Sequence, residues 1–100
     1  MFAIVWQLNA EITLEEEMDF ILKKWNFKEV QNFKDLVYKQ LSQLEVNPRL
    51  GNFKPELQIF SLVISKQTTL YYDFDEDSKI IDLHFFWNNL KKPDDLNKLL

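Results

Sequence analysis

The chain has 100 residues and a mass of 12.1 kDa, enough for one ordinary domain spanning residues 1–100. Hydrophobic residues make up 46% and charged residues 28%, the balance of a folded domain and not of a disordered chain. The absence of cysteine excludes a disulfide framework, a thiolate nucleophile and a cysteine-ligated metal. Twelve basic and sixteen acidic residues give a net charge of −4, which argues against nucleic acid as a direct partner, since such binding neutralises phosphates.

The N-terminal apolar run, residues 1–6, is short and has no basic start. We therefore expect neither a signal peptide nor a membrane anchor, and residues 2–8 are predicted to form a buried strand. A chain without cysteine fits a reducing compartment. The expectation is a cytoplasmic protein with no cofactor, no metal and no membrane association.

Two amphipathic helices are predicted next. Thr13 followed by Glu16 has the spacing of a capping box, so the first helix is expected to begin there and to end before Asn26. A second apolar stripe predicts a helix that ends near Glu45, because Asn47-Pro48 stops it. The members of this stripe are Val30, Phe33, Val37, Leu41 and Leu44. The short link between the helices predicts an antiparallel helical hairpin.

The helical pattern stops after Val46, and residues 46–56 are expected to form turns. The only glycine, Gly51, marks a place that needs a left-handed backbone or a close backbone approach. After Pro55 the period becomes two, which predicts three strands joined by short turns. These strands cover residues 57–66, 69–75 and 79–88. Pro93 ends the last of them, and the tail 93–100 either docks as a terminal turn or frays.

The predicted fold is therefore α+β: a strand, an antiparallel helical hairpin and a three-stranded antiparallel meander. We expect one four-stranded sheet with both helices on one face, and the first strand at the edge beside the second. All three meander strands are apolar on both faces, with Phe85 grouped with Ile81 and Leu83, and Phe86 on the opposite face. Because two helices cover only one face, the other face is expected to bind another chain.

Sites for chemistry are few. His84 is the only imidazole, and without cysteine it offers neither a metal site nor an evident catalytic partner. The acidic residues at 73–77 lack the glycine of a calcium loop and are expected to form a solvated turn. Trp87 is either a core residue or an aromatic anchor for a partner segment.

Three segments together resemble the C-terminal half of the RelE/ParE superfamily of bacterial toxins: Leu62–Lys66, Thr68–Tyr72 and Ile80–Asn88. Asn47–Gly51 is similar to the loop after the second helix of that family, and the opening strand and helical hairpin are similar as well. The resemblance runs from about residue 3 to residue 93, and the order of elements is the same.

The resemblance implies the toxin of a type II toxin–antitoxin module, a class that includes plasmid stabilisation systems. RelE-like members cut mRNA on the ribosome with lysine and arginine side chains on the sheet. This chain differs at the positions that look equivalent, and Lys66 is the one lysine left in the block. The residues there are Phe60, Leu62, Thr69 and Asn89. The non-enzymatic ParE-like branch, which binds DNA gyrase, is therefore the favoured interpretation.

Two alternatives stay open. One is a RelE-like endonuclease acting on the ribosome, with an unusual site built from basic side chains and the histidine; its residues would be Lys66, Lys91, Lys92 and His84. The other is an interaction domain without toxicity.

The expected partner is an antitoxin with a disordered arm. If this prediction fails, a homodimer that forms through the same surface is the alternative. The residues predicted to bind that partner are Arg49, Lys54, Lys66, Phe86 and Trp87.

Overall fold

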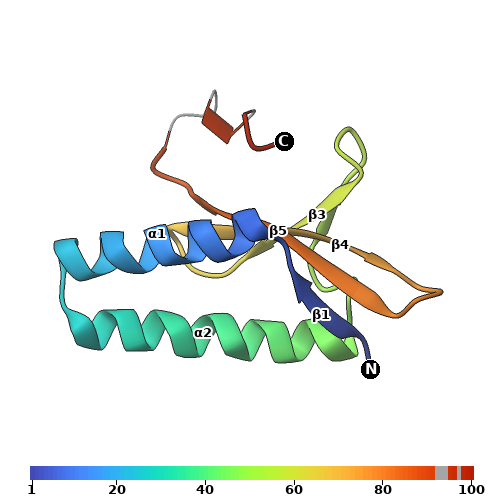
Figure 1. Ribbon diagram of the computed structural model, residues 1–100, viewed down its shortest axis with the longest axis horizontal. Coiled ribbons are helices and arrows are strands. Elements are labelled where there is room, and N and C mark those ends of the chain that lie inside the picture. Colours follow the sequence, from blue (N-terminus) through green and yellow to red (C-terminus); the bar gives the residue numbers. More distant parts are fainter. Residues whose placement is uncertain (92–94, 97) are drawn as a thin grey trace.

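The computed structural model describes residues 1–91, 95–96 and 98–100, so Lys92, Pro93 and the start of the tail lie outside the described residues. In chain order, one strand comes first, two helices follow it, and the remaining strands come last (Figure 1). The elements are β1 (Ala3–Trp6), α1 (Leu8–Lys24), α2 (Phe27–Val46), β2 (Asn52–Lys54), β3 (Ile59–Val63), β4 (Thr68–Asp75) and β5 (Ile80–Asn88). In this part of the chain no helix is both long and apolar enough to cross a membrane.

The sheet has five strands in the order β1-β5-β4-β3-β2. The antiparallel meander of β3, β4 and β5 is confirmed. The predicted four-stranded sheet is wrong in two respects. The short strand β2 forms in the segment expected to be only turns, and β1 pairs in parallel with β5. The two errors have one cause: β2 occupies the free edge of β3, so the remaining edge for β1 is that of β5.

Helix α1 begins at Leu8, several residues before the predicted capping box. Thr13 lies inside the helix, where its hydroxyl donates to the carbonyl of Asn9 and accepts the N–H of Phe86 in β5 at 2.8 Å. The capping-box prediction is therefore wrong, because this threonine joins the helix to the sheet. Helix α2 does have a cap: Asn26 Oδ1 accepts the N–H of Glu29 at 2.9 Å.

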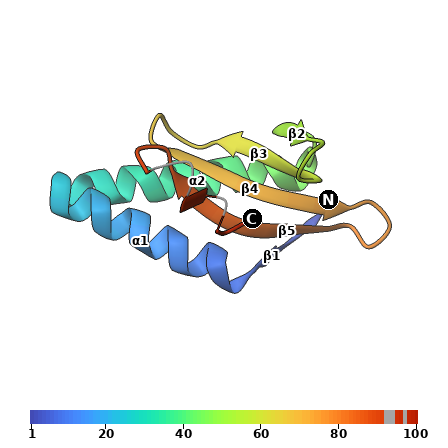
Figure 2. The ribbon, with the colours of Figure 1, turned by 90° about the horizontal axis from the view of Figure 1, so that it is seen from above.

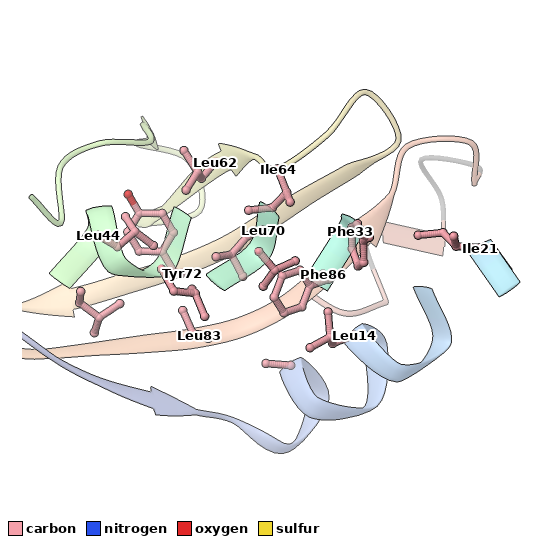
Figure 3. Close-up of a cluster of buried hydrophobic side chains, with 14 of the residues drawn as sticks. Leu14, Ile21, Phe33, Leu44, Leu62, Ile64, Leu70, Tyr72, Leu83 and Phe86 are labelled. Atoms are coloured by element: carbon pink, nitrogen blue, oxygen red, sulfur yellow. The ribbon is translucent and has the colours of Figure 1, made fainter. Parts of the chain in front are cut away.

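The core lies between the helices and one face of the sheet. All five residues of the predicted α2 stripe are buried. They pack in one cluster with Leu14 and Ile21 of α1 and with Leu70, Tyr72 and Leu83 of the sheet (Figure 3). This cluster agrees with the prediction that both helices cover the same face of the sheet.

A register shift between β4 and β5 changes which aromatic side chains face the core. Tyr71 pairs with Phe85 but Tyr72 pairs with Leu83, so His84 is an extra residue in β5. Phe86 therefore points to the helices and is only 2% exposed, while Phe85 lies on the opposite face. The sequence pattern predicted the reverse, because simple alternation cannot anticipate a bulge.

Gly51 sits where two backbones approach closely. A Cβ atom at this position would lie 2.6 Å from the carbonyl oxygen of Ser61 and 2.8 Å from the Tyr72 hydroxyl. That hydroxyl accepts the Gly51 N–H at 2.9 Å and donates to the carbonyl of Pro48 at 2.8 Å. The close approach, and not a left-handed backbone, is thus the reason for the glycine.

Candidate partner-binding face

We call the sheet face that points away from the core the open face. The strand register places two rows of side chains on it. One row contains Ser61, Tyr71 and Phe85, and the other contains Val63, Thr69 and Trp87. The rings of Tyr71 and Phe85 stack with centroids 4.9 Å apart. Most of these side chains are nevertheless buried, with Phe85 2% exposed and Ser61 and Thr69 8% exposed each, so Val63 and Tyr71 are the apolar side chains of these two rows that remain accessible to a partner.

Trp87 is on the open face but is only 6% exposed. The Lys91 ammonium lies 5.7 Å from its ring centroid. A 740 Å³ cavity beside it is lined by α1, by the end of β5 and by Asp95, Lys98 and Leu99, and the C-terminus lies in front of β5 (Figure 2). Trp87 therefore lines a cavity and is not a freely exposed anchor.

A buried carboxylate lines the same cavity. Glu17 of α1 is 5% exposed and accepts hydrogen bonds from Thr68 Oγ1 and Asn88 Nδ2, both at 3.0 Å. Burial raises the pKa of Glu17, and the two hydrogen bonds oppose this shift only in part. Sequence reasoning missed this residue. The available signal was its spacing, since Glu17 lies between Leu14 and Ile21 on the buried face of α1.

His84 is paired with Asp73 on the open face, with His84 Nε2 and Asp73 Oδ2 3.0 Å apart. Both side chains are partly exposed. Asp82 is nearby in the register and accepts a hydrogen bond from Gln7 Nε2. The centre of this face therefore carries more acidic than basic groups, although His84 and Asp73 have the arrangement of an oriented base.

The predicted basic residues separate toward the two ends of the sheet. Arg49 forms an ion pair with Glu76 at the β4–β5 turn, and Lys54 pairs with Ile59 on the edge strand β2. Lys66 lies in the β3–β4 turn, where its carbonyl accepts from Asn89 Nδ2, so it shares the other end with Lys91. The two ends of β4 are about 23 Å apart. Lys92 is outside the described residues.

The structure thus places Lys66, Lys91 and Trp87 at one end of the sheet, and Arg49 and Lys54 at the other. Phe86 lies in the core and is not available to a partner. A single partner segment can contact the remaining four only by running along the sheet. Among residues 1–91, 95–96 and 98–100 there is no group of three or more histidine or acidic side chains placed to hold a metal ion.

Comparison with family models and with curated proteins gives no match. Comparison with solved structures gives a chain in the crystal structure of the toxin–antitoxin complex RelBE2 from Mycobacterium tuberculosis. The match has a TM-score of 0.58 and 16% identity, and it covers 88% of this chain and 98% of that chain. This chain has a RelBE2-like fold. At this identity the likeness establishes the fold, and it agrees with the arrangement that the sequence resemblance implied.

Proposed function

We propose that this chain is the toxin of a type II toxin–antitoxin module and that it acts by binding its target, in the manner of the ParE-like branch. The observation that carries the proposal is the fold, which matches a chain of a toxin–antitoxin complex over 88% of this chain. The sequence resemblance to the RelE/ParE superfamily supports the same assignment. DNA gyrase is the candidate target that the ParE-like branch implies.

The composition of the sheet supports binding over RNA cleavage. Cleaving a phosphodiester bond requires cations aimed at the charge that develops in the transition state. Strands β3, β4 and β5, whose residues are all described, contain no lysine and no arginine. Their polar groups on the open face include Asp73 and His84 instead.

The antitoxin is proposed to bind along the open face. An extended segment of about eight residues spans β4. Its apolar side chains would cover Val63 and Tyr71, and acidic side chains near its ends would meet Lys54 and Lys66. Burial of each large apolar side chain contributes roughly 1.5–3 kcal/mol before ordering costs.

The test is expression of the chain alone and together with the product of the adjacent reading frame. We expect growth arrest with the chain alone, rescue by co-expression, and inhibition of gyrase supercoiling by the purified chain. Primer extension on mRNA from translating ribosomes should show no new ends. Growth without arrest would instead favour the interaction domain without toxicity.

One observation favours the endonuclease as a second candidate. His84 is oriented by Asp73, and two lysines share one end of the sheet. Codon-positioned cleavage that disappears in both His84→Ala and Lys66→Ala would establish this alternative and overturn the binding mechanism. Cleavage that persists in both variants would point to a contaminating nuclease.

A further inference from the structure

The loop that joins α1 to α2 forms an exposed apolar and basic surface. We call residues 22–29 the hairpin tip; every one of them is exposed. Trp25 is 48% exposed and Phe27 is 64% exposed. Large aromatic side chains are costly to leave in water, and two together at one tip are characteristic of an interaction surface.

A pocket of 320 Å³ lies between the hairpin tip and the β3–β4 turn. Its floor is apolar, because Ile21 and Phe33 lie at this end of the core (Figure 3). Trp25 and Leu36 also line it, and its charged lining residues are Lys66 from the turn and Glu29 from α2. The pocket is of a size and polarity to take one large apolar side chain.

The charge around this pocket is opposite to that of the whole chain. The hairpin tip has three lysines and one glutamate, and the β3–β4 turn adds Lys66, so four positive and one negative charges give +3, against −4 for the chain. Lys24, Lys28 and Lys66 form no ion pair with any residue that the structure describes. An anionic partner is therefore attracted to this end of the molecule.

We propose that the pocket binds an apolar side chain of an acidic, amphipathic peptide segment from a partner protein. A peptide fits better than a nucleic acid for two reasons. The floor is hydrocarbon, and the Lys24 ammonium lies 4.8 Å from the Trp25 ring centroid, over a face that base stacking would need. The surface belongs to the helical hairpin and shares only Lys66 with the proposed antitoxin face, so it does not depend on the toxin assignment.

The experiment titrates the whole chain with a fluorescein-labelled 14-residue peptide that has leucine along one helical face and glutamate elsewhere. Fluorescence anisotropy gives the affinity. We expect Trp25→Ala and Lys66→Glu each to weaken binding at least about tenfold. The matched controls are Tyr38→Ala and Lys39→Glu, an exposed aromatic and an exposed lysine of α2 that do not line this pocket, and they should leave the affinity within about twofold.

Two further probes separate the possible ligands. A peptide with serine in place of leucine should bind at least about tenfold more weakly, because it lacks the apolar anchor. A 14-nucleotide uridine RNA should not compete. Binding of the RNA in place of the peptide, equal binding of the serine peptide, or an affinity unchanged in both Trp25→Ala and Lys66→Glu would each overturn the proposal. So would the absence of peptide binding, provided that circular dichroism shows the chain folded.

Discussion

At the scale of single residues, two buried polar side chains connect segments that are distant in the sequence. The Glu17 carboxylate joins α1 to the adjoining ends of β4 and β5, and the Tyr72 hydroxyl joins β4 to the loop before β2. Burial raises the pKa of both groups. The hydrogen bonds of each group offset part of the free energy that its removal from water costs.

The raised pKa of Glu17 predicts a pH-dependent stability. Between the ordinary pKa of glutamate and the raised pKa, the folded state holds a proton that the unfolded state has lost. This residue's contribution to stability therefore falls as pH rises through that window and stays reduced above it. We expect the free energy of unfolding of Glu17→Gln, relative to wild type, to increase between about pH 4 and pH 8. Urea unfolding measures it.

The control for this prediction is Glu15→Gln, since Glu15 is an exposed glutamate of the same helix. Its stability relative to wild type should change little over the same range. A Glu17→Gln difference that is constant with pH would mean that folding leaves the pKa of Glu17 unchanged, and one that decreases would mean that the carboxylate is stabilised as an anion in the folded protein.

Gly51→Ala is predicted to destabilise the fold by about 1–3 kcal/mol, because the added methyl group meets the Ser61 carbonyl and the Tyr72 hydroxyl. The neighbouring exposed position offers a matched control in Asn52→Ala, which should cost less than about 0.5 kcal/mol. Thermal unfolding followed by circular dichroism compares the two variants. Equal melting temperatures would show that the loop can move away without cost.

Among the helices and strands, α1 contacts the edge of β5 beyond the point where β1 ends. The last backbone hydrogen bond between the β1 segment and β5 is donated by the N–H of Gln7 to the carbonyl of Leu83. Further along, the N–H of Phe86 is accepted by the Thr13 hydroxyl of α1. The helix thereby satisfies a backbone donor that a longer strand would otherwise pair, and it fixes how α1 sits against the sheet.

Thr13→Val keeps the side-chain shape but removes this acceptor, so the buried Phe86 N–H is left unpaired. We predict a loss of about 1–3 kcal/mol in the free energy of unfolding and faster hydrogen exchange at Phe86. Ser42→Ala serves as control, because Ser42 bonds only to its own helix at an exposed site. Unchanged exchange at Phe86 would show that another group or water satisfies that amide.

At the scale of the whole molecule, charge is divided between two ends. Residues 73–82 carry five acidic groups and one lysine at the β4–β5 end, whereas the hairpin tip and the β3–β4 turn carry four lysines and one glutamate. The net charge of the chain is −4, but the end of the molecule at the hairpin tip and the β3–β4 turn is basic. Partners that approach the molecule are oriented by this separation before they make contact.

A partner that runs along the open face should be sensitive to a charge placed there. Val63 is 60% exposed on this face, so Val63→Glu should leave the fold intact and weaken binding of the adjacent gene's product by at least about tenfold. Val46→Glu, exposed at the end of α2, is the matched control. Calorimetric titration measures both, and equal loss in the two variants would argue against the open face as the binding surface. Phe86→Asp would be uninformative, because that side chain is in the core.

The elements whose periodicity is local could be predicted from the amino-acid sequence. The α2 stripe and the three meander strands were predicted within a few residues. When one face of an element is buried, its apolar residues recur with a period of 3.6 in a helix and 2 in a strand. Gly51 was recognised as a special position because it is the only glycine of the chain and lies among turn residues. The folded structure was needed to establish the pairing of β1 with β5, the bulge at His84 that exchanges the faces of Phe85 and Phe86, and the hydrogen bonds by which Thr13 and Glu17 join α1 to the sheet. These features depend on which edges and donors remain free once the chain has folded, and that information is not local.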